Sequence, residues 1–194
     1  MRETVMKEKD KILKKYSTGK NVIIFFIITQ IFYAFMMFIT IPKISEYSEG
    51  MKIFDLIPTG YSVGYAEKLL EALGETGRNI YLFQQIPLDM FYPLFFAITY
   101  SLLLYYLFKK IFKQNSRIFI LSIVPVLAGL FDYLENIGII SMLLKYPEFS
   151  PNIAKITNIF SLFKSFFTTM FFVLLIGSVI IILIKKVKKR ARLE

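Results

Sequence analysis

The residues of this sequence that could do chemistry are carboxylates inside a long apolar segment. Asp132 and Glu135, with Asn136 beside Glu135, interrupt the otherwise uncharged stretch 118–144. A stretch of that length can cross a bilayer, which needs roughly 20 apolar residues. A charged side chain at the bilayer centre costs at least ~2.5 kcal/mol, so an ionisable group there is by default a functional-site hypothesis. The i, i+3 and i, i+4 spacings put these side chains on one face of a helix.

Other apolar segments also contain polar residues, and these fall at a similar depth. From the rise of a helix, Asp89, Lys164 and Gln30 lie about 12 to 16 Å from the outer ends of their segments. Asp132 and Glu135 lie about 14 to 18 Å from the outer end of theirs. Polar groups scattered by accident would not be expected to share one level. We therefore predict an acidic pocket in the outer half of the bilayer, with these candidate residues: Asp89, Asp132, Glu135, Asn136, Lys164, Tyr92, Tyr133 and Gln30.

The charges of this predicted pocket do not balance. Three carboxylates and one lysine leave two negative charges, which a dry interior cannot hold. Either some carboxyl groups are protonated or a cation completes the site. Glu135 and Lys164 match best in depth and are the expected ion pair. Asp89 and Asp132 would then depend on hydrogen-bond donors from the remaining candidates, namely Tyr92, Tyr133, Gln30 and Asn136.

Two residue types that many enzymes need are missing from the chain. The sequence has no His and no Cys, which removes the usual general base near neutral pH and the commonest zinc ligands. Intramembrane zinc hydrolases, Ser-His proteases and quinone-linked dithiol reductases are therefore excluded. We predict no metal site, and the sequence does not identify a cofactor.

The elements that must position these residues are membrane-spanning helices. Apolar residues make up 56% of the chain and the mean hydropathy is +0.57, which is too apolar for a soluble domain. The fold predicted is all-α, an integral membrane four-helix bundle whose spans are kinked by prolines such as Pro87 and Pro93. Gly129 should let a neighbouring helix approach closely. The predicted units are a basic arm (1–20), a membrane domain (21–185) with spans near 22–41, 80–108, 118–144 and 156–184, and a basic tail (186–194).

The longest polar connection, 43–79, contains an amphipathic helix over 62–73. Val63, Ala66, Leu69, Leu70 and Leu73 share one face of this helix, and Gly74 is its expected stop. A long connection with its own helix is often a lid over a site. The alternative is a helix that rests on the lipid headgroups. Arg78 would be either a lid group that reaches the pocket or an interfacial anchor.

The basic residues indicate topology rather than nucleic-acid binding. The net charge is +10, but Lys and Arg cluster in the N-terminal arm, in 109–117 and in 185–192, each next to an apolar span. Under the positive-inside rule this pattern places both termini in the cytoplasm and the connection 43–79 outside. We expect a multi-pass protein of a bacterial plasma membrane, with membrane lipids and no nucleic acid as partners.

Three functions remain open on the sequence. The acidic pocket could bind or translocate a cation, a proton or an amine-bearing lipophile through ion pairs and cation–π contacts. It could instead belong to an intramembrane enzyme that modifies a lipid or isoprenoid with paired carboxylates as acid and base. The third alternative is a structural subunit without chemistry. Four spans are few for a monomeric transporter, so transport would require a homodimer or a larger membrane complex.

Overall fold

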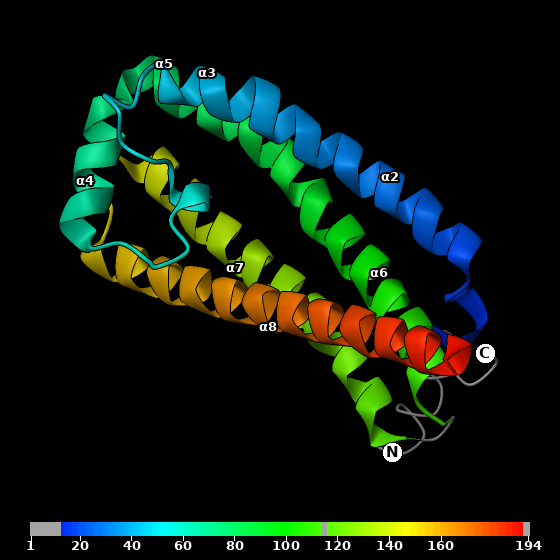
Figure 1. Cartoon of the computed structure of the whole chain (residues 1–194). Helices are drawn as coiled ribbons and strands as arrows, with labels where there is room; N and C mark the ends of the chain where they lie inside the picture. Colours follow the sequence, from blue (N-terminus) through cyan, green and yellow to red (C-terminus); the bar gives the residue numbers. More distant parts are fainter. Residues whose placement is uncertain (1–12, 114–115, 192–194) are drawn as a thin grey trace.

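The computed structural model describes residues 13–113 and 116–191 and is all-α over these ranges (Figure 1). Four helices are long and apolar enough to cross a membrane: Gly19–Ser45, Gly74–Ile111, Arg117–Lys145 and Pro151–Arg190. They indicate a multi-pass membrane protein, and the predicted four-helix fold class is confirmed. Each helix extends a few residues beyond the apolar segment predicted from the sequence, because helical hydrogen bonding continues where apolar composition ends.

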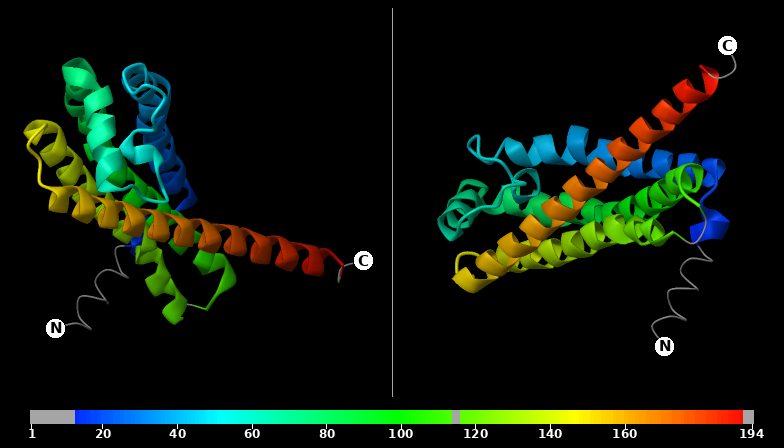
Figure 2. Two further views of the ribbon diagram at one scale, coloured as in Figure 1. Left: turned by 90° about the vertical axis from the view of Figure 1, so that its left-hand side faces the viewer. Right: turned by 60° about the horizontal axis from the view of Figure 1, so that its bottom comes forward.

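The two middle helices form the centre of the bundle. The helix of the first span packs along that of the second, the second along the third, and the third along the fourth (Figure 2). In the apolar windows of the second and third helices 44% of the residues are buried, against 17% in the first and 11% in the fourth. The first and fourth helices therefore leave most of their surface exposed.

Both of the first two spans contain a widened, π-helical turn. The first span comprises α2 (Gly19–Phe35), the π segment η1 (Met36–Thr40) and α3 (Ile41–Ser45). The second comprises α5 (Gly74–Ile80), the π segment η3 (Tyr81–Gln85) and α6 (Ile86–Ile111).

A proline follows each of these π segments at once, Pro42 after η1 and Pro87 after η3. Since proline has no N–H and its ring clashes with the carbonyl four residues earlier, the backbone widens there. The first helix continues through Pro42 to Ser45. The hydroxyl of Thr40 donates to Oε1 of Gln85, which joins the two π segments.

The third and fourth spans approach their neighbours closely at glycines. The third comprises a 3-10 segment η4 (Arg117–Ile123) and α7 (Val124–Lys145), and the fourth is the single helix α8 (Pro151–Arg190). A Cβ on Gly129 would lie 2.8 Å from the carbonyl oxygen of Pro93, and one on Gly138 would lie 1.9 Å from Oγ1 of Thr157. The close approach predicted at Gly129 is confirmed.

The connection between the first two spans, residues 46–73, packs on one end of the bundle, and we call it the cap. It contains η2 (Phe54–Leu56) and α4 (Val63–Ala72). The predicted apolar face of α4 is buried at Ala66, Leu69, Leu70 and Leu73. Helix α4 ends before Gly74, as predicted, and Gly74, at φ +57°, is the first residue of α5.

Contacts to α8 hold the cap in place. The backbone N–H of Tyr61 donates to Oδ1 of Asn158 over 2.7 Å, and Gly60 lies against the same side chain. Ile53 and Phe54 are completely buried in a hydrophobic cluster that includes residues of the first three spans. The connection is therefore packed on the spans.

The predicted basic arm and tail lie partly outside the described residues, since 1–12 and 192–194 are not described. Residues 13–16 are helical. Nζ of Lys109 donates to the carbonyl oxygen of Ser17 over 2.7 Å, which attaches this short segment to the end of α6. Helix α8 continues through the basic tail as far as Arg190.

Candidate functional site

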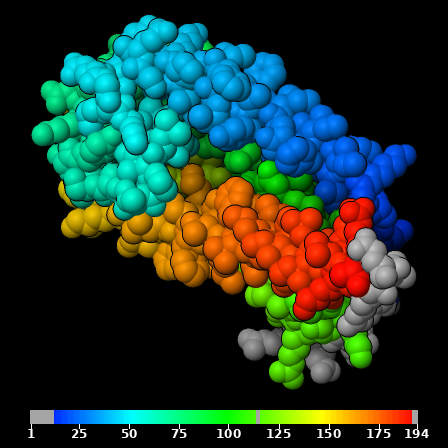
Figure 3. Space-filling model, in the orientation of Figure 1, coloured from blue at the N-terminus to red at the C-terminus, as the bar shows by residue number. Residues whose placement is uncertain are grey.

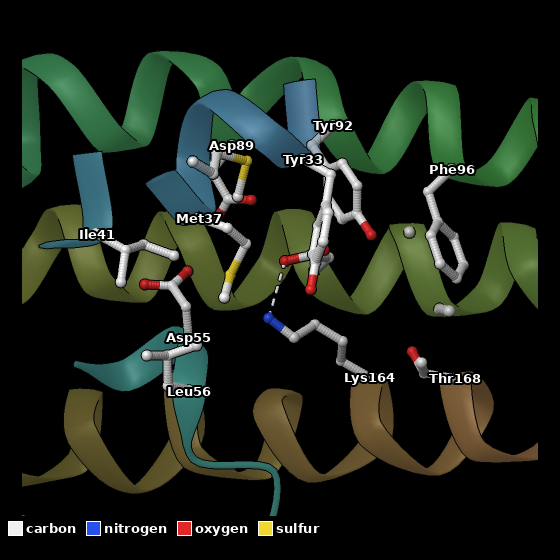
Figure 4. A pocket seen from close by; sticks show the side chains of 14 residues that line it. Tyr33, Met37, Ile41, Asp55, Leu56, Asp89, Tyr92, Phe96, Lys164 and Thr168 are labelled. Carbon is white, nitrogen blue, oxygen red and sulfur yellow. Dashed lines mark hydrogen bonds and ion pairs between the residues drawn. The ribbon is translucent and has the colours of Figure 1, made fainter. Parts of the chain in front are cut away.

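A cavity of about 280 Å³ lies beneath the cap, between the four spans (Figure 4). Its charged lining residues come from four different elements: Asp55 from η2, Asp89 from α6, Asp132 from α7 and Lys164 from α8. The rest of the lining is aromatic or apolar apart from Thr168, and it includes Tyr33, Tyr92, Phe96, Met36 and Met37. The cavity therefore combines an acidic group of side chains with an apolar wall.

Lys164 is shared between two carboxylates of α7. Its Nζ lies 2.5 Å from Oε2 of Glu135 and 3.1 Å from Oδ1 of Asp132. The pair expected from depth, Glu135 with Lys164, is present. The expectation that Asp132 would depend on neutral donors is wrong. The reason is geometric: residues three apart on α7 point to the same side, so one ammonium on α8 reaches both.

Asp89 forms no ion pair with a basic side chain among the described residues. Its residue is only 2% exposed, and its Oδ2 atom has no hydrogen-bond partner among the described residues. Lys164 is already engaged with Glu135 and Asp132. Because a buried carboxylate oxygen is costly to leave unpaired, Asp89 is the group that most needs a further partner.

The site contains one acid that the sequence analysis missed. Asp55 lines the cavity, where its Oδ2 accepts a hydrogen bond from the hydroxyl of Tyr81. Its Oδ1 is buried and lacks a partner within residues 13–113 and 116–191. The signal was available, because Asp55 is the only charged residue in the apolar run 53–57 of an otherwise polar connection.

Tyr61 adds a buried hydroxyl near this group of acids. The side chain packs against Phe54 with ring centroids 4.7 Å apart and the rings tilted by 43°, and its hydroxyl has no hydrogen-bond partner in the described part of the chain. Burial, followed by the nearby carboxylates Glu135 and Asp55, raises the pKa of Tyr61 well above its ordinary value. The hydroxyl therefore remains protonated at physiological pH.

The other predicted residues take different places. Tyr92 lines the cavity and lies beside Tyr33, with ring centroids 6.0 Å apart. Asn136 is completely buried next to the cavity, and its Nδ2 donates to the backbone carbonyl of Asp89 over 3.0 Å. It fixes α6 against α7 at the level of the acids.

Five predicted residues do not line the cavity: Glu135 and Asn136, which are buried beside it, and Gln30, Tyr133 and Arg78. Nε2 of Gln30 donates to the hydroxyl of Tyr100 over 3.2 Å, and the Tyr133 hydroxyl donates to the carbonyl of Met90 over 2.7 Å. Arg78 donates to the carbonyl of Leu70 over 2.8 Å and lies over the ring of Tyr146, 4.2 Å from its centroid. Arg78 thus ties α4 and α5 to the end of α7 rather than reaching the site.

The arrangement gives the cavity an excess of acid. Asp55, Asp89 and Asp132 line the cavity, Glu135 is buried against Lys164, and Lys164 is the one basic residue of the lining. Across the described ranges, no three acidic side chains converge closely enough to hold a metal ion. Chemically, the site offers the unpartnered oxygens of Asp55 and Asp89 to a positively charged hydrogen-bond donor.

Comparisons of the chain with protein-family models, with curated proteins and with solved structures found no match.

Proposed function

We propose that this membrane protein binds a positively charged ligand, an inorganic cation or an organic ammonium, in the acidic cavity beneath its cap. The observation that carries the proposal is the unpartnered carboxylate oxygen of Asp89, buried beside an ammonium that two other acids already share. Either ligand would offset a buried charge at this point, an ammonium by donating a hydrogen bond to the carboxylate oxygen and an inorganic cation by coordinating it.

Two further features support a cationic ligand. Asp55 presents a second unpartnered oxygen to the same cavity from the cap, so a ligand would be held from two sides. The rings of Tyr33 and Tyr92 line the cavity next to these acids. Aromatic faces attract cations, with a contribution of about 0.5–2 kcal/mol depending on how far the pair is desolvated.

The distribution of basic residues supports an orientation for the site. With the clusters 109–117 and 185–192 in the cytoplasm of a bacterial cell, the cap and the cavity lie in the outer half of the plasma membrane. The site would then receive its ligand from the outer leaflet or the external medium. Translocation through the membrane would require a homodimer or larger assembly in addition.

The proposal is tested by the stability of the purified protein in nanodiscs. Methylammonium chloride should raise the unfolding temperature of the wild type above its value in sodium chloride of equal ionic strength. Asp89→Asn and Asp55→Asn keep the side-chain shape and should abolish this increase. Glu71→Gln, an exposed acid on α4, is the matched control and should leave the increase intact.

A structural subunit would behave differently. Its melting temperature would not respond to methylammonium, sodium or potassium beyond ionic strength, and both Asn variants would match the wild type. Mass spectrometry of the protein extracted from its native membrane, which should show a retained amine or cation, provides an independent measurement.

A further inference from the structure

We infer that the ligand is an amphiphile with a primary amine, whose hydrocarbon chain lies in a groove between α2 and α8 that opens toward the lipid. This inference rests on the proposed function, because it takes the acidic cavity as the binding site of the amine. It adds the class of ligand, its orientation and its route of entry.

The groove is visible on the surface of the molecule. In Figure 3 the surface is hollowed between α2 and α8, and atoms of α6 lie at its bottom. The same elements line the cavity, since Met37 comes from the first span, Thr168 from α8 and Phe96 from α6. Because the first and fourth helices are the two most lipid-exposed spans, an opening between them faces hydrocarbon.

Above the cavity, the cap covers the other approach. Asp55 and Leu56 of η2 form the lining on that side, and the neighbouring Ile53 and Phe54 are completely buried. A ligand that enters from the membrane through the groove avoids disrupting this packed cap. A ligand that enters from the lipid must first dissolve in the bilayer, so it needs an apolar portion of its own.

The charged groups of the cavity lie toward the cap, and an aromatic ring lies at the far end. In Figure 4, Asp55 and Asp89 lie at the end under the cap, Lys164 lies between the two ends, and Phe96 and Thr168 lie at the opposite end. On α6, Phe96 follows Tyr92 by four residues, and on α8 Thr168 follows Lys164 by four. An amphiphile of the outer leaflet has this same order, with its head group outward and its chain toward the bilayer centre.

The head group follows from the unpartnered atoms. Two carboxylate oxygens accept no hydrogen bond from the described residues, namely Oδ2 of Asp89 and Oδ1 of Asp55. Asp89 as a whole residue is only 2% exposed. A primary ammonium has three N–H donors and can bond to both oxygens at once. A quaternary ammonium has no N–H, and an alcohol has no charge to offset the excess of acid.

Photolabelling of the full-length protein in nanodiscs tests this inference. The probe is a twelve-carbon primary amine with a diazirine at the far end of its chain, and its control is the alcohol of the same length and label. We expect the amine to label residues of α2 and α8 that border the groove about tenfold more than the alcohol does, which corresponds to roughly 1.4 kcal/mol.

Two adjacent threonines supply matched variants. Thr168 lines the cavity, whereas Thr169 is exposed on another face of α8. Thr168→Trp should fill the groove and reduce amine-specific labelling about tenfold, while Thr169→Trp should leave it unchanged. Both variants are exposed to the same amount of probe in the bilayer, so membrane partitioning cannot produce the difference.

A lipid competition identifies the source of the amine. Phosphatidylethanolamine in place of phosphatidylcholine should compete with the probe if the natural ligand is an amine-bearing phospholipid, and should not if it is a free alkylamine.

The outcomes separate this inference from the proposed function. Methylammonium could stabilise the protein while the amine and the alcohol label the same lipid-facing residues equally. The groove would then not bind the hydrocarbon chain of the ligand, and this inference would be overturned while the proposed function stands. Equal effects of Thr168→Trp and Thr169→Trp would also overturn it. If neither methylammonium nor the long-chain amine binds, the proposed function fails as well.

Discussion

Asn136 donates its side-chain amide to the one backbone carbonyl of α6 that Pro93 deprives of its helical partner. That carbonyl belongs to Asp89, four residues before Pro93, and the distance from Nδ2 to the oxygen is 3.0 Å. In a helix it would accept from the N–H of residue 93, which proline lacks. A polar side chain from α7 thus repairs the break in α6 beside the acidic cavity, and it holds the Asp89 backbone in place.

The first prediction concerns this repair. Asn136→Ala should lower the free energy of unfolding by about 1–3 kcal/mol, because it leaves a buried carbonyl without a donor. In a Pro93→Ala background the backbone N–H returns, and the cost of Asn136→Ala should shrink markedly. Unfolding of the four variants by SDS titration in mixed micelles measures this cycle. Equal costs in both backgrounds would show that the hydrogen bond does not serve this purpose.

Lys164 gives a second prediction, because two acids share its charge. Lys164→Leu should destabilise the protein by about 3–5 kcal/mol by leaving buried carboxylates without their counter-ion. Adding Glu135→Leu should recover more of this loss than adding Asp132→Leu, since the Glu135 side chain is fully buried and that of Asp132 is 11% exposed. The triple variant, with Lys164, Glu135 and Asp132 all changed to Leu, should recover the largest part of the lost stability. Strictly additive losses in a thermal unfolding series would refute the shared ion pair.

The close helix contacts give a third prediction, which compares two glycines. Gly138→Ala should cost about 1–3 kcal/mol, because the new Cβ would collide with Oγ1 and Cβ of Thr157 across the interface of α7 and α8. Gly177→Ala in α8 meets nothing within 4 Å and should stabilise the protein by up to about 1 kcal/mol through helix propensity. Similar effects of the two substitutions on the unfolding midpoint would contradict the close contact of α7 with α8 at Gly138.

The fourth prediction concerns Tyr61 and alkaline pH. Its folded pKa is raised above the ordinary value of 10.0 by burial, so the folded protein retains a proton that the unfolded chain releases. Stability from this residue is therefore complete below about pH 10 and falls as the pH rises further. Tyr61→Phe removes a buried hydroxyl without a described partner and should be neutral or stabilising by up to about 1 kcal/mol at pH 7.

At pH 11 the advantage of Tyr61→Phe over the wild type should grow by about 1 kcal/mol. Denaturant unfolding in detergent at pH 7 and pH 11 measures both values, and Tyr47→Phe, which changes an exposed tyrosine of the cap, is the control. A constant difference between Tyr61→Phe and the wild type across this range would mean that the Tyr61 hydroxyl ionises normally.

The fifth prediction is the topology. Reporter fusions at Lys113 and after residue 194 should report a cytoplasmic location, and one at Glu71 in α4 should report an external one, because only this arrangement puts the basic clusters on one side. An external signal at Lys113 would reverse the proposed orientation and move the cavity to the inner half of the bilayer.

The fold class and much of the candidate site could be predicted from residue types and spacing. Four long apolar segments can only be helices in lipid, because every backbone polar group must be satisfied within the segment. Asp132 and Glu135 share a face because the helical period is fixed, and matching depth was enough to pair Glu135 with Lys164. The buried face of α4 followed from its 3.6-residue period.

What the sequence determined by itself is local: which segments are helices, which faces are polar, and how deep each charge lies. The tertiary structure alone decided which polar groups meet. Asp55 joins the cavity because the cap folds back onto the bundle. No periodic pattern of apolar residues in the sequence predicts this contact. Gln30 and Tyr133 share the predicted depth but bond to Tyr100 and Met90 instead. Depth along a helix axis is fixed by residue count, whereas the direction in which each face points is fixed only when the helices pack.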